Sequence, residues 1–230
     1  RLIPYPKHNL LMLVPFASAE KACEAVSSIF QEGITPSGME FMERDAIDWT
    51  LKYVQDVMLP IGEKVQAHLL IEVDGNNMDV LMEECQQIAE IVERFDADEV
   101  IFADTPSEKE ALWKLRRRVG EAVKSNSIYK EEDTVVPRAE LAKLLKGVKS
   151  IGAAYGFKSV CYGHAGDGNL HVNIVKAEMS DEAWNNELPK AIREIFELVK
   201  KLGGTISGEH GIGWVQKNYL DVVFDEVNLS

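Results

Sequence analysis

The sequence lacks the features of a membrane or secreted protein. No apolar run approaches the roughly 18 residues that a membrane-spanning helix needs. The longest run, LLMLVPF at 10–16, suits a buried strand better. No basic leader with a small-residue cleavage site precedes it, so we predict neither a membrane span nor a secretory signal.

Cysteine and positive charge are also scarce. Cys23, Cys85 and Cys161 are odd in number and widely spaced, and no CxxC occurs, so a disulfide framework is not expected and a reducing, cytoplasmic location is predicted. The chain has 25 basic and 38 acidic residues, for a net charge of −13. Such a surface repels phosphate backbones and anionic lipids, which argues against general nucleic-acid binding.

The rest of the composition is that of an ordinary globular protein, with 46% hydrophobic and 27% charged residues. Strand-like and helix-like periodicities alternate, and the DG pair at 167–168 predicts an antiparallel hairpin. We therefore expect an α+β fold, with helices packed on one face of a mostly antiparallel sheet, ferredoxin-like and possibly duplicated. A doubly wound parallel sheet is the alternative, which the hairpin disfavours. The expected strands are 10–16, 39–42, 68–73, 99–103, 134–136, 159–165 and 169–175, and the expected helices are 18–31, 45–54, 78–95, 107–123, 138–155 and 180–202.

Two helix starts have recognisable caps. Ser18 is the expected N-cap of the first helix, and Ser107 followed by Glu110 has the spacing of a capping box. The chain begins at Arg1 and stops where an amphipathic stretch begins. We interpret residues 1–230 as a single truncated domain of a larger protein.

The segment CYGHAGDGNLHVNI at 161–174 carries most of the predicted chemistry. A two-residue type I′ turn at Asp167 and Gly168 would make His164 and His171 direct cross-strand neighbours. The apolar residues of the hairpin would then lie on one face, with Tyr162, His164, His171 and Asn173 on the other. Two imidazoles on one face can bind the same metal ion. Cys161 falls on the buried face and should be inert.

A second cluster, GGTISGEHGIG at 203–213, has the wrong glycine order for a dinucleotide-binding loop. Its glycines would instead let the backbone approach a ligand closely and present Glu209 and His210. A carboxylate beside two histidines forms a set that suits Zn, Mn, Fe or Co with open positions for substrate. A flexible glycine loop with an exposed Glu-His pair is the bland alternative. His8 and His68 are interpreted as surface or internally satisfied histidines.

The helix around WKLRRR at 113–118 supplies three consecutive arginines, one of which could bind a carboxylate in bidentate fashion. With these residues identified, the sequence resembles the C-terminal (cap) domain of the FAD-linked oxidases, the family of glycolate oxidases, D-lactate dehydrogenases and D-2-hydroxyglutarate dehydrogenase. HAGDGNLHVN at 164–173 is similar to the HxGDGNxHxN signature of that family, and SGEHGIG at 207–213 to a second one. LWKLR at 112–116 resembles its LWxxR element, and DTVVP at 133–137 its DxxxP element.

The resemblance implies a role for each matching residue. His164, His171 and Glu209 would hold a divalent metal (Zn, Mn or Fe). Asn173 and Arg116 would bind substrate, and His210 would be the general base on its C2 hydroxyl. Lys217 is a candidate for one further cation near the substrate. The C2 hydride would pass to FAD, held mainly by an N-terminal domain that this sequence does not contain, so the fragment alone would be inactive.

Two departures narrow the implied substrate. The 2-hydroxyglutarate-type members have Ser or Thr one turn after the arginine and a lysine before DxxxP. In this sequence, Gly120 occupies the first position. At the second position stands Glu131, and the lysine, Lys130, is shifted by one residue. The resemblance therefore favours a smaller D-2-hydroxy acid such as glycolate or D-lactate. The implied partners are the protein's own FAD domain or companion subunits, with a homodimer as a further option. A free-standing metal-binding module or metal-dependent hydrolase is the alternative function, and a decayed interaction domain is a third hypothesis.

Overall fold

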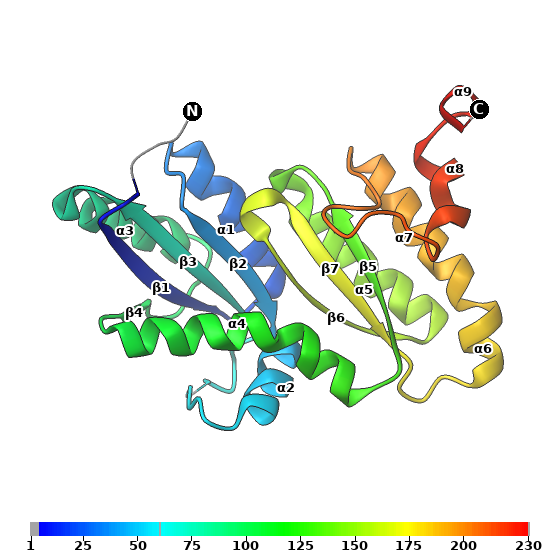
Figure 1. Cartoon of the computed structure of the whole chain (residues 1–230), viewed down its shortest axis with the longest axis horizontal. Coiled ribbons are helices and arrows are strands. Elements are labelled where there is room, and N and C mark those ends of the chain that lie inside the picture. The colour runs from blue at the N-terminus through cyan, green and yellow to red at the C-terminus, as the bar shows by residue number, and fades with distance from the viewer. Residues whose placement is uncertain (1–4, 60, 230) are drawn as a thin grey trace.

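The computed structural model describes residues 5–59 and 61–229. Over this part of the chain, helices flank a single sheet of seven strands (Figure 1). The strands are β1 (His8–Phe16), β2 (Gly38–Glu43), β3 (Ala67–Gly75), β4 (Ile101–Ala103), β5 (Tyr129–Val135), β6 (Lys158–Gly163) and β7 (Asn169–Val175). The helices are α1 (Ala19–Gln31), α2 (Arg44–Val54), α3 (Met78–Glu93), α4 (Pro106–Asn126), α5 (Leu141–Tyr155), α6 (Asp181–Asn186), α7 (Leu188–Lys201), α8 (Leu220–Val223) and α9 (Glu226–Leu229). Short 3₁₀ turns are η1 (Arg138–Glu140), η2 (Ala165–Asp167) and η3 (Lys217–Tyr219).

The strand order β4-β1-β3-β2-β6-β7-β5 divides the sheet into two similar halves, and all neighbouring strands are antiparallel. The first half has the order β4-β1-β3-β2, as in a βαββαβ unit. The second repeats it as β6-β7-β5, with α5 and α7 as its helices. Thr205 adds one bridge to Val135 at the outer edge of β5, where a fourth strand would lie. The predicted α+β fold with a mostly antiparallel sheet is confirmed, and the topology is that of a duplicated ferredoxin-like unit.

The two halves meet between β2 and β6, where only Phe41–Gly163 and Met42–Tyr162 are paired. Beyond these pairs, the Glu43 side chain, rather than the backbone of β2, accepts a hydrogen bond from β6. Its Oε2 accepts the N–H of Cys161 at 2.9 Å and a proton of the Lys149 ammonium at 2.8 Å. The ion pair between Glu43 and Lys149 thus adds a side-chain contact between two halves that have little backbone pairing.

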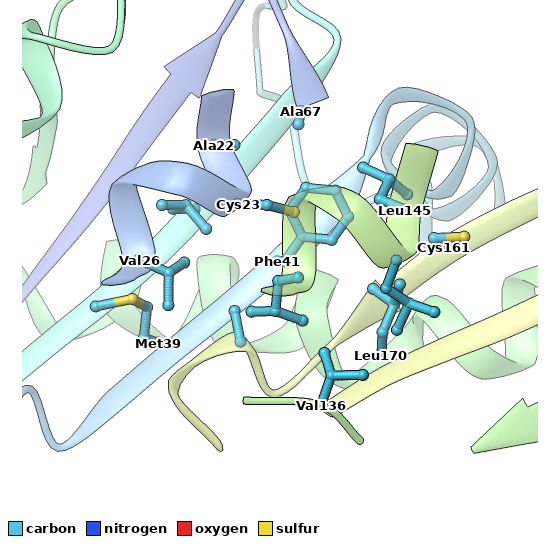
Figure 2. Packing of buried hydrophobic residues seen from close by; sticks show 14 of the residues in the cluster. Ala22, Cys23, Val26, Met39, Phe41, Ala67, Val136, Leu145, Cys161 and Leu170 are labelled. Carbon is cyan, nitrogen blue, oxygen red and sulfur yellow. The ribbon is translucent and has the colours of Figure 1, made fainter. Parts of the chain in front are cut away.

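The larger core lies between the sheet and helices α1, α3, α5 and α7. Figure 2 shows part of this core, with Cys23, Phe41, Leu145, Cys161 and Leu170 among its labelled residues. All three cysteines are buried and unbridged. Burial raises the pKa of the Cys161 thiol to about 12, so this residue is an inert core side chain, as the sequence predicted.

Helices α2 and α4 cover part of the second face of the sheet, and α4 crosses the front of the molecule in Figure 1. Leu11 and Leu13 pack under these helices, whereas Met12 and Val14 point into the larger core. The helices therefore occupy both faces rather than one. The continuous apolar run in β1 fits this arrangement, since a strand buried on both sides needs no polar alternation.

The helix boundaries follow local capping chemistry. The Ser18 hydroxyl caps α1 as predicted, by accepting the N–H of Lys21 at 3.3 Å. The capping box of α4 is formed by Thr105 and Glu108, with Pro106 at the first turn, so the predicted Ser107–Glu110 box was wrong by two residues. The single helix predicted over 180–202 is divided into α6 and α7. Among the described residues, no helix is both long and apolar enough to cross a membrane.

Candidate active site

The histidine hairpin forms between β6 and β7, but its turn is longer than predicted. Tyr162, not His164, pairs with His171, and the chain turns through η2 and Gly168. The predicted two-residue I′ turn was therefore wrong. The register differs by two residues, an even number, so each side chain keeps its predicted face. His164 lies at the start of the turn, where its carbonyl accepts the N–H of Asp167 at 2.9 Å and of Asn169 at 3.1 Å.

The two hairpin histidines and Glu209 converge. The ring centres of His164 and His171 are 5.9 Å apart, and Glu209 Oε1 lies 3.5 Å from Nε2 of each. Ligand atoms around a tetrahedral ion with bonds of about 2.0–2.2 Å are about 3.3–3.6 Å apart. These three residues therefore fit a divalent ion with little rearrangement. His210 stacks on His171 at 5.1 Å and faces the same carboxylate oxygen at 3.9 Å.

Asp133 holds the glycine loop against the hairpin. Its Oδ2 accepts the backbone N–H groups of Gly208, Glu209 and His210 at 2.8, 2.7 and 2.8 Å. Its Oδ1 accepts a proton of the Asn169 amide at 2.6 Å. Burial acts to raise the pKa of the Asp133 carboxyl, but the N–H groups of His210 and Glu209 outweigh it and lower the pKa. A buried anion thus fixes the backbone of the two loop residues with predicted roles.

Glu40 connects His164 to Arg116. Its Oε1 lies 2.8 Å from His164 Nδ1, and its Oε2 accepts the Arg116 Nε–H at 2.8 Å. Burial acts to raise the pKa of the Glu40 carboxyl, yet the contacts with His164 and Arg116 give it a net lowered pKa. Arg116 Nη2 is buried without a partner, and the guanidinium centre lies 5.4 Å from the Tyr162 ring centre. One buried donor of Arg116 therefore remains free beside the histidines.

Glu131 occupies the other side of the hairpin. Its Oε1 lies 3.5 Å from His171 Nδ1 and accepts the Tyr162 hydroxyl at 3.4 Å. Burial lowers the pKa of the His171 imidazole to about 4, so His171 is neutral near pH 7. Both side-chain amide atoms of Asn173 are buried without partners. An unpaired buried amide is energetically costly, so Asn173 has unused hydrogen-bonding capacity beside His171.

The cluster borders an open pocket of about 510 Å³, lined by the first residues of β5 and by the segment from His210 to Gln216. Trp214 belongs to this lining and is largely exposed. The ammonium group of Lys217, the further cation predicted near the substrate, lies 3.2 Å from the centre of the Trp214 ring, which lines this pocket. The structure therefore brings six predicted residues together, and Lys217 contacts Trp214 in the lining of the bordering pocket. The six are His164, His171, Glu209, His210, Asn173 and Arg116.

Two sets of donor atoms could hold a metal ion among the described residues. One is the predicted set of His164, His171 and Glu209, and the other combines Glu131, His171 and His210. In each set, the ligand atoms all lie within 4.8 Å of one another. Sequence reasoning missed the contributions of Glu40 and Asp133. The signal for Glu40 was an acidic residue inside the short strand predicted at 39–42, and the signal for Asp133 was its place in the DTVVP element.

The chain matches the family model described as FAD linked oxidases, C-terminal domain, over residues 5–230. It belongs to this family. The resemblance noted in the sequence is thereby confirmed. D-lactate dehydrogenase of Anaerostipes hadrus is 32% identical, with 96% of this chain and 47% of the relative covered. The glycolate oxidase subunit GlcD of Bacillus subtilis is 34% identical, with 96% and 46% covered.

The chain thus spans about half the length of the curated relatives that it matches. Solved structures share its fold. An alkyldihydroxyacetonephosphate synthase aligns with a TM-score of 0.57 at 14% identity, over 95% of this chain and 43% of that one. A p-cresol methylhydroxylase with substrate bound aligns with a TM-score of 0.58 at 11% identity, over 89% and 45%. At these identities the likeness concerns the fold alone.

Proposed function

We propose that this domain supplies the substrate- and metal-binding groups of a flavin-dependent dehydrogenase or oxidase. Its substrate would be a small D-2-hydroxy acid of the glycolate or D-lactate type, oxidised to the 2-oxo acid. The observation that carries the proposal is the placement of Glu209 Oε1 at 3.5 Å from Nε2 of both His164 and His171. The names of two relatives, a D-lactate dehydrogenase and a glycolate oxidase subunit, support the substrate class.

His164, His171 and Glu209 would hold the divalent ion, which is Zn, Mn or Fe in our proposal. Two imidazoles and one carboxylate leave coordination positions open for a substrate. When bound, such an ion lowers the pKa of a coordinated hydroxyl group. Because the three ligands come from the hairpin and the loop that Asp133 holds, the site needs no large rearrangement to form.

The remaining residues would act on the substrate directly. Arg116 has an unpartnered buried Nη2 that would donate to the substrate carboxylate. The unpaired amide of Asn173 would hydrogen-bond the same molecule. His210, half-exposed beside Glu209, would accept the proton of the C2 hydroxyl. FAD, when bound, supplies the acceptor for the C2 hydride.

FAD would be brought by the protein's own N-terminal domain or by a companion subunit, and a homodimer and a cytoplasmic location belong to the same proposal. The alternative considered from the sequence was a metal-dependent hydrolase built on the same ligands. The match to a family of oxidases over 5–230 favours the oxidoreductase.

The first test is elemental mass spectrometry of the purified chain. We expect close to one divalent ion per wild-type chain, none in His164→Ala/His171→Ala, and an unchanged amount in His8→Ala, which removes an exposed histidine outside the cluster. The second test is NMR of the loaded chain with D-lactate and L-lactate, in which only the D form should shift the Asn173 and His210 signals. A wild-type chain without metal, or equal responses to the two lactates, would contradict the proposal.

A further inference from the structure

His164 and His171 have similar hydrogen-bonding surroundings, although the His164 side chain is 38% exposed and that of His171 only 5%. The Nε2 atom of each is 3.5 Å from Glu209 Oε1. The Nδ1 atom of each faces a carboxylate on the neighbouring strand: Glu40 for His164, at 2.8 Å, and Glu131 for His171, at 3.5 Å. In the order β2-β6-β7-β5, Glu40 and Glu131 approach the hairpin from its two opposite sides.

A carboxylate at Nδ1 determines which nitrogen can bind a ligand. A neutral imidazole has one N–H group, and a carboxylate can only accept a hydrogen bond. A histidine that donates from Nδ1 to a carboxylate carries its proton on Nδ1, and its Nε2 lone pair, which here faces Glu209, is then free to bind an ion. The carboxylate also fixes the ring orientation and makes the free nitrogen more basic.

We propose that Glu40 and Glu131 are positioning residues that hold His164 and His171 as Nδ1–H tautomers, with both Nε2 lone pairs directed at one ion beside Glu209. This inference rests on the proposed metal site. Each carboxylate has its own support, since Glu40 accepts the Arg116 Nε–H and Glu131 accepts the Tyr162 hydroxyl. His171 Nδ1 is buried and makes no hydrogen bond in the structure. Glu131 Oε1, at 3.5 Å, is the nearest carboxylate oxygen that could receive its proton, and Asp133 Oδ1 lies farther away at 3.9 Å.

Glu131 also belongs to the second possible ligand set, with His171 and His210. An ion there would compete with the orienting role if it bound His171 Nδ1. The orienting role is favoured because the arrangement at His171 repeats that at His164, where Glu40 is already bound to Arg116. The number of ions bound distinguishes the two roles.

The first measurement is heteronuclear NMR of the imidazole nitrogens in the metal-free full chain at about pH 8.5, where unperturbed imidazoles are neutral. We expect Nδ1–H for both His164 and His171. The Glu40→Gln variant should change the tautomer balance of His164 alone, and Glu131→Gln that of His171 alone. An Nε2–H tautomer of either histidine in the wild-type chain would overturn the inference.

The second measurement is zinc titration of the same variants, with circular dichroism to establish that each is folded. Loss of an orienting carboxylate should weaken zinc binding by about 10–100-fold. Glu132→Gln is the matched control, because this neighbour on β5 points to the opposite face, and its affinity should equal that of the wild type.

Unchanged affinity in folded Glu40→Gln and Glu131→Gln would overturn the inference while leaving the metal site intact. Two ions per wild-type chain, with one lost in Glu131→Gln, would make Glu131 a ligand instead. If the wild type binds no zinc, the proposed function fails, and the tautomers still decide the inference.

Discussion

The backbone N–H of Glu209 donates a 2.7 Å hydrogen bond to Oδ2 of Asp133, a residue 76 positions earlier in the chain. The same oxygen accepts the neighbouring N–H groups of Gly208 and His210. The buried Asp133 carboxylate on β5 thus holds the glycine loop in place through its backbone N–H groups. The side chains of Glu209 and His210 remain free for a ligand because they take no part in holding the loop.

Replacing Asp133 with asparagine should loosen this loop. An amide offers one acceptor oxygen, and its NH₂ group would face N–H donors, so we expect the free energy of unfolding to fall by about 3 kcal/mol. Urea denaturation measures the loss, and hydrogen exchange of the Gly208–His210 amides should become faster. Asp181→Asn, which alters an exposed carboxylate, should change stability by less than about 0.5 kcal/mol. Unchanged exchange at Gly208–His210 would show that another contact orders the loop.

The turn of the hairpin should not tolerate a side chain at Gly168. This residue has a φ of +75°, and a Cβ there would overlap the Val136 carbonyl oxygen. Gly33 is a matched control, with a φ of +86° and open space around its Cα. We expect Gly33→Ala to lose about 1–2 kcal/mol through the left-handed backbone alone, and Gly168→Ala to lose clearly more. Equal losses in thermal or urea unfolding would mean that the turn can move away from Val136.

Glu132 should make the protein less stable at alkaline pH. Burial raises the pKa of this carboxyl from 4.5 to about 7, although Gln216 donates to it at 2.9 Å. The unfolded chain therefore releases this proton first, and stability is lost as the pH rises from about 4.5 through 7. We expect Glu132→Gln to gain up to about 3 kcal/mol over the wild type at pH 8 and almost nothing at pH 4.5. Urea denaturation at the two pH values measures this, and equal gains at both would contradict it.

His68 should act in the opposite direction. It lies in the core under α2 and α4, where burial, assisted by the positive charge of Arg44, lowers the pKa of its imidazole from 6.5 to about 4. The unfolded chain takes up this proton first, so stability present above pH 6.5 is lost as the pH falls through 4. We expect up to about 3 kcal/mol of acid-dependent loss in the wild type and none from this source in His68→Leu.

Between about pH 4.5 and 6.5 the effects of Glu132 and His68 on stability oppose each other. The single variants should therefore tilt the stability curve in opposite directions, and parallel curves would refute both assignments.

Much of the fold could be predicted from the sequence because apolar runs and turn residues are local signals. The run in β1 and the helix cap at Ser18 were both identified in this way. The face on which His171 and Asn173 lie was also correct, since alternation along a strand survives an even shift in register. The turn itself was not predicted, because a 3₁₀ turn through Ala165–Asp167 contains the same DG pair that a two-residue turn prefers.

The residues that sequence reasoning missed depend on contacts between distant parts of the chain. β5 was predicted only over 134–136, because its first residues, YKEED, are too polar to be recognised as a strand. They form one because Glu131 and Asp133 face the site on one side and Glu132 meets Gln216 on the other. Glu40 lies 124 positions from His164, so no local pattern could have joined them.

If the proposed site binds a molecule, the scarcity of backbone pairing between β2 and β6 gives that binding a mechanical consequence. Glu40 and Arg116 belong to the first half of the molecule, whereas His164 and Glu209 belong to the second. A molecule bound by groups from both halves would hold the two halves together across this narrow junction. Tight binding should therefore stiffen the twist between the two halves, and any strain that opens the junction should release the bound molecule.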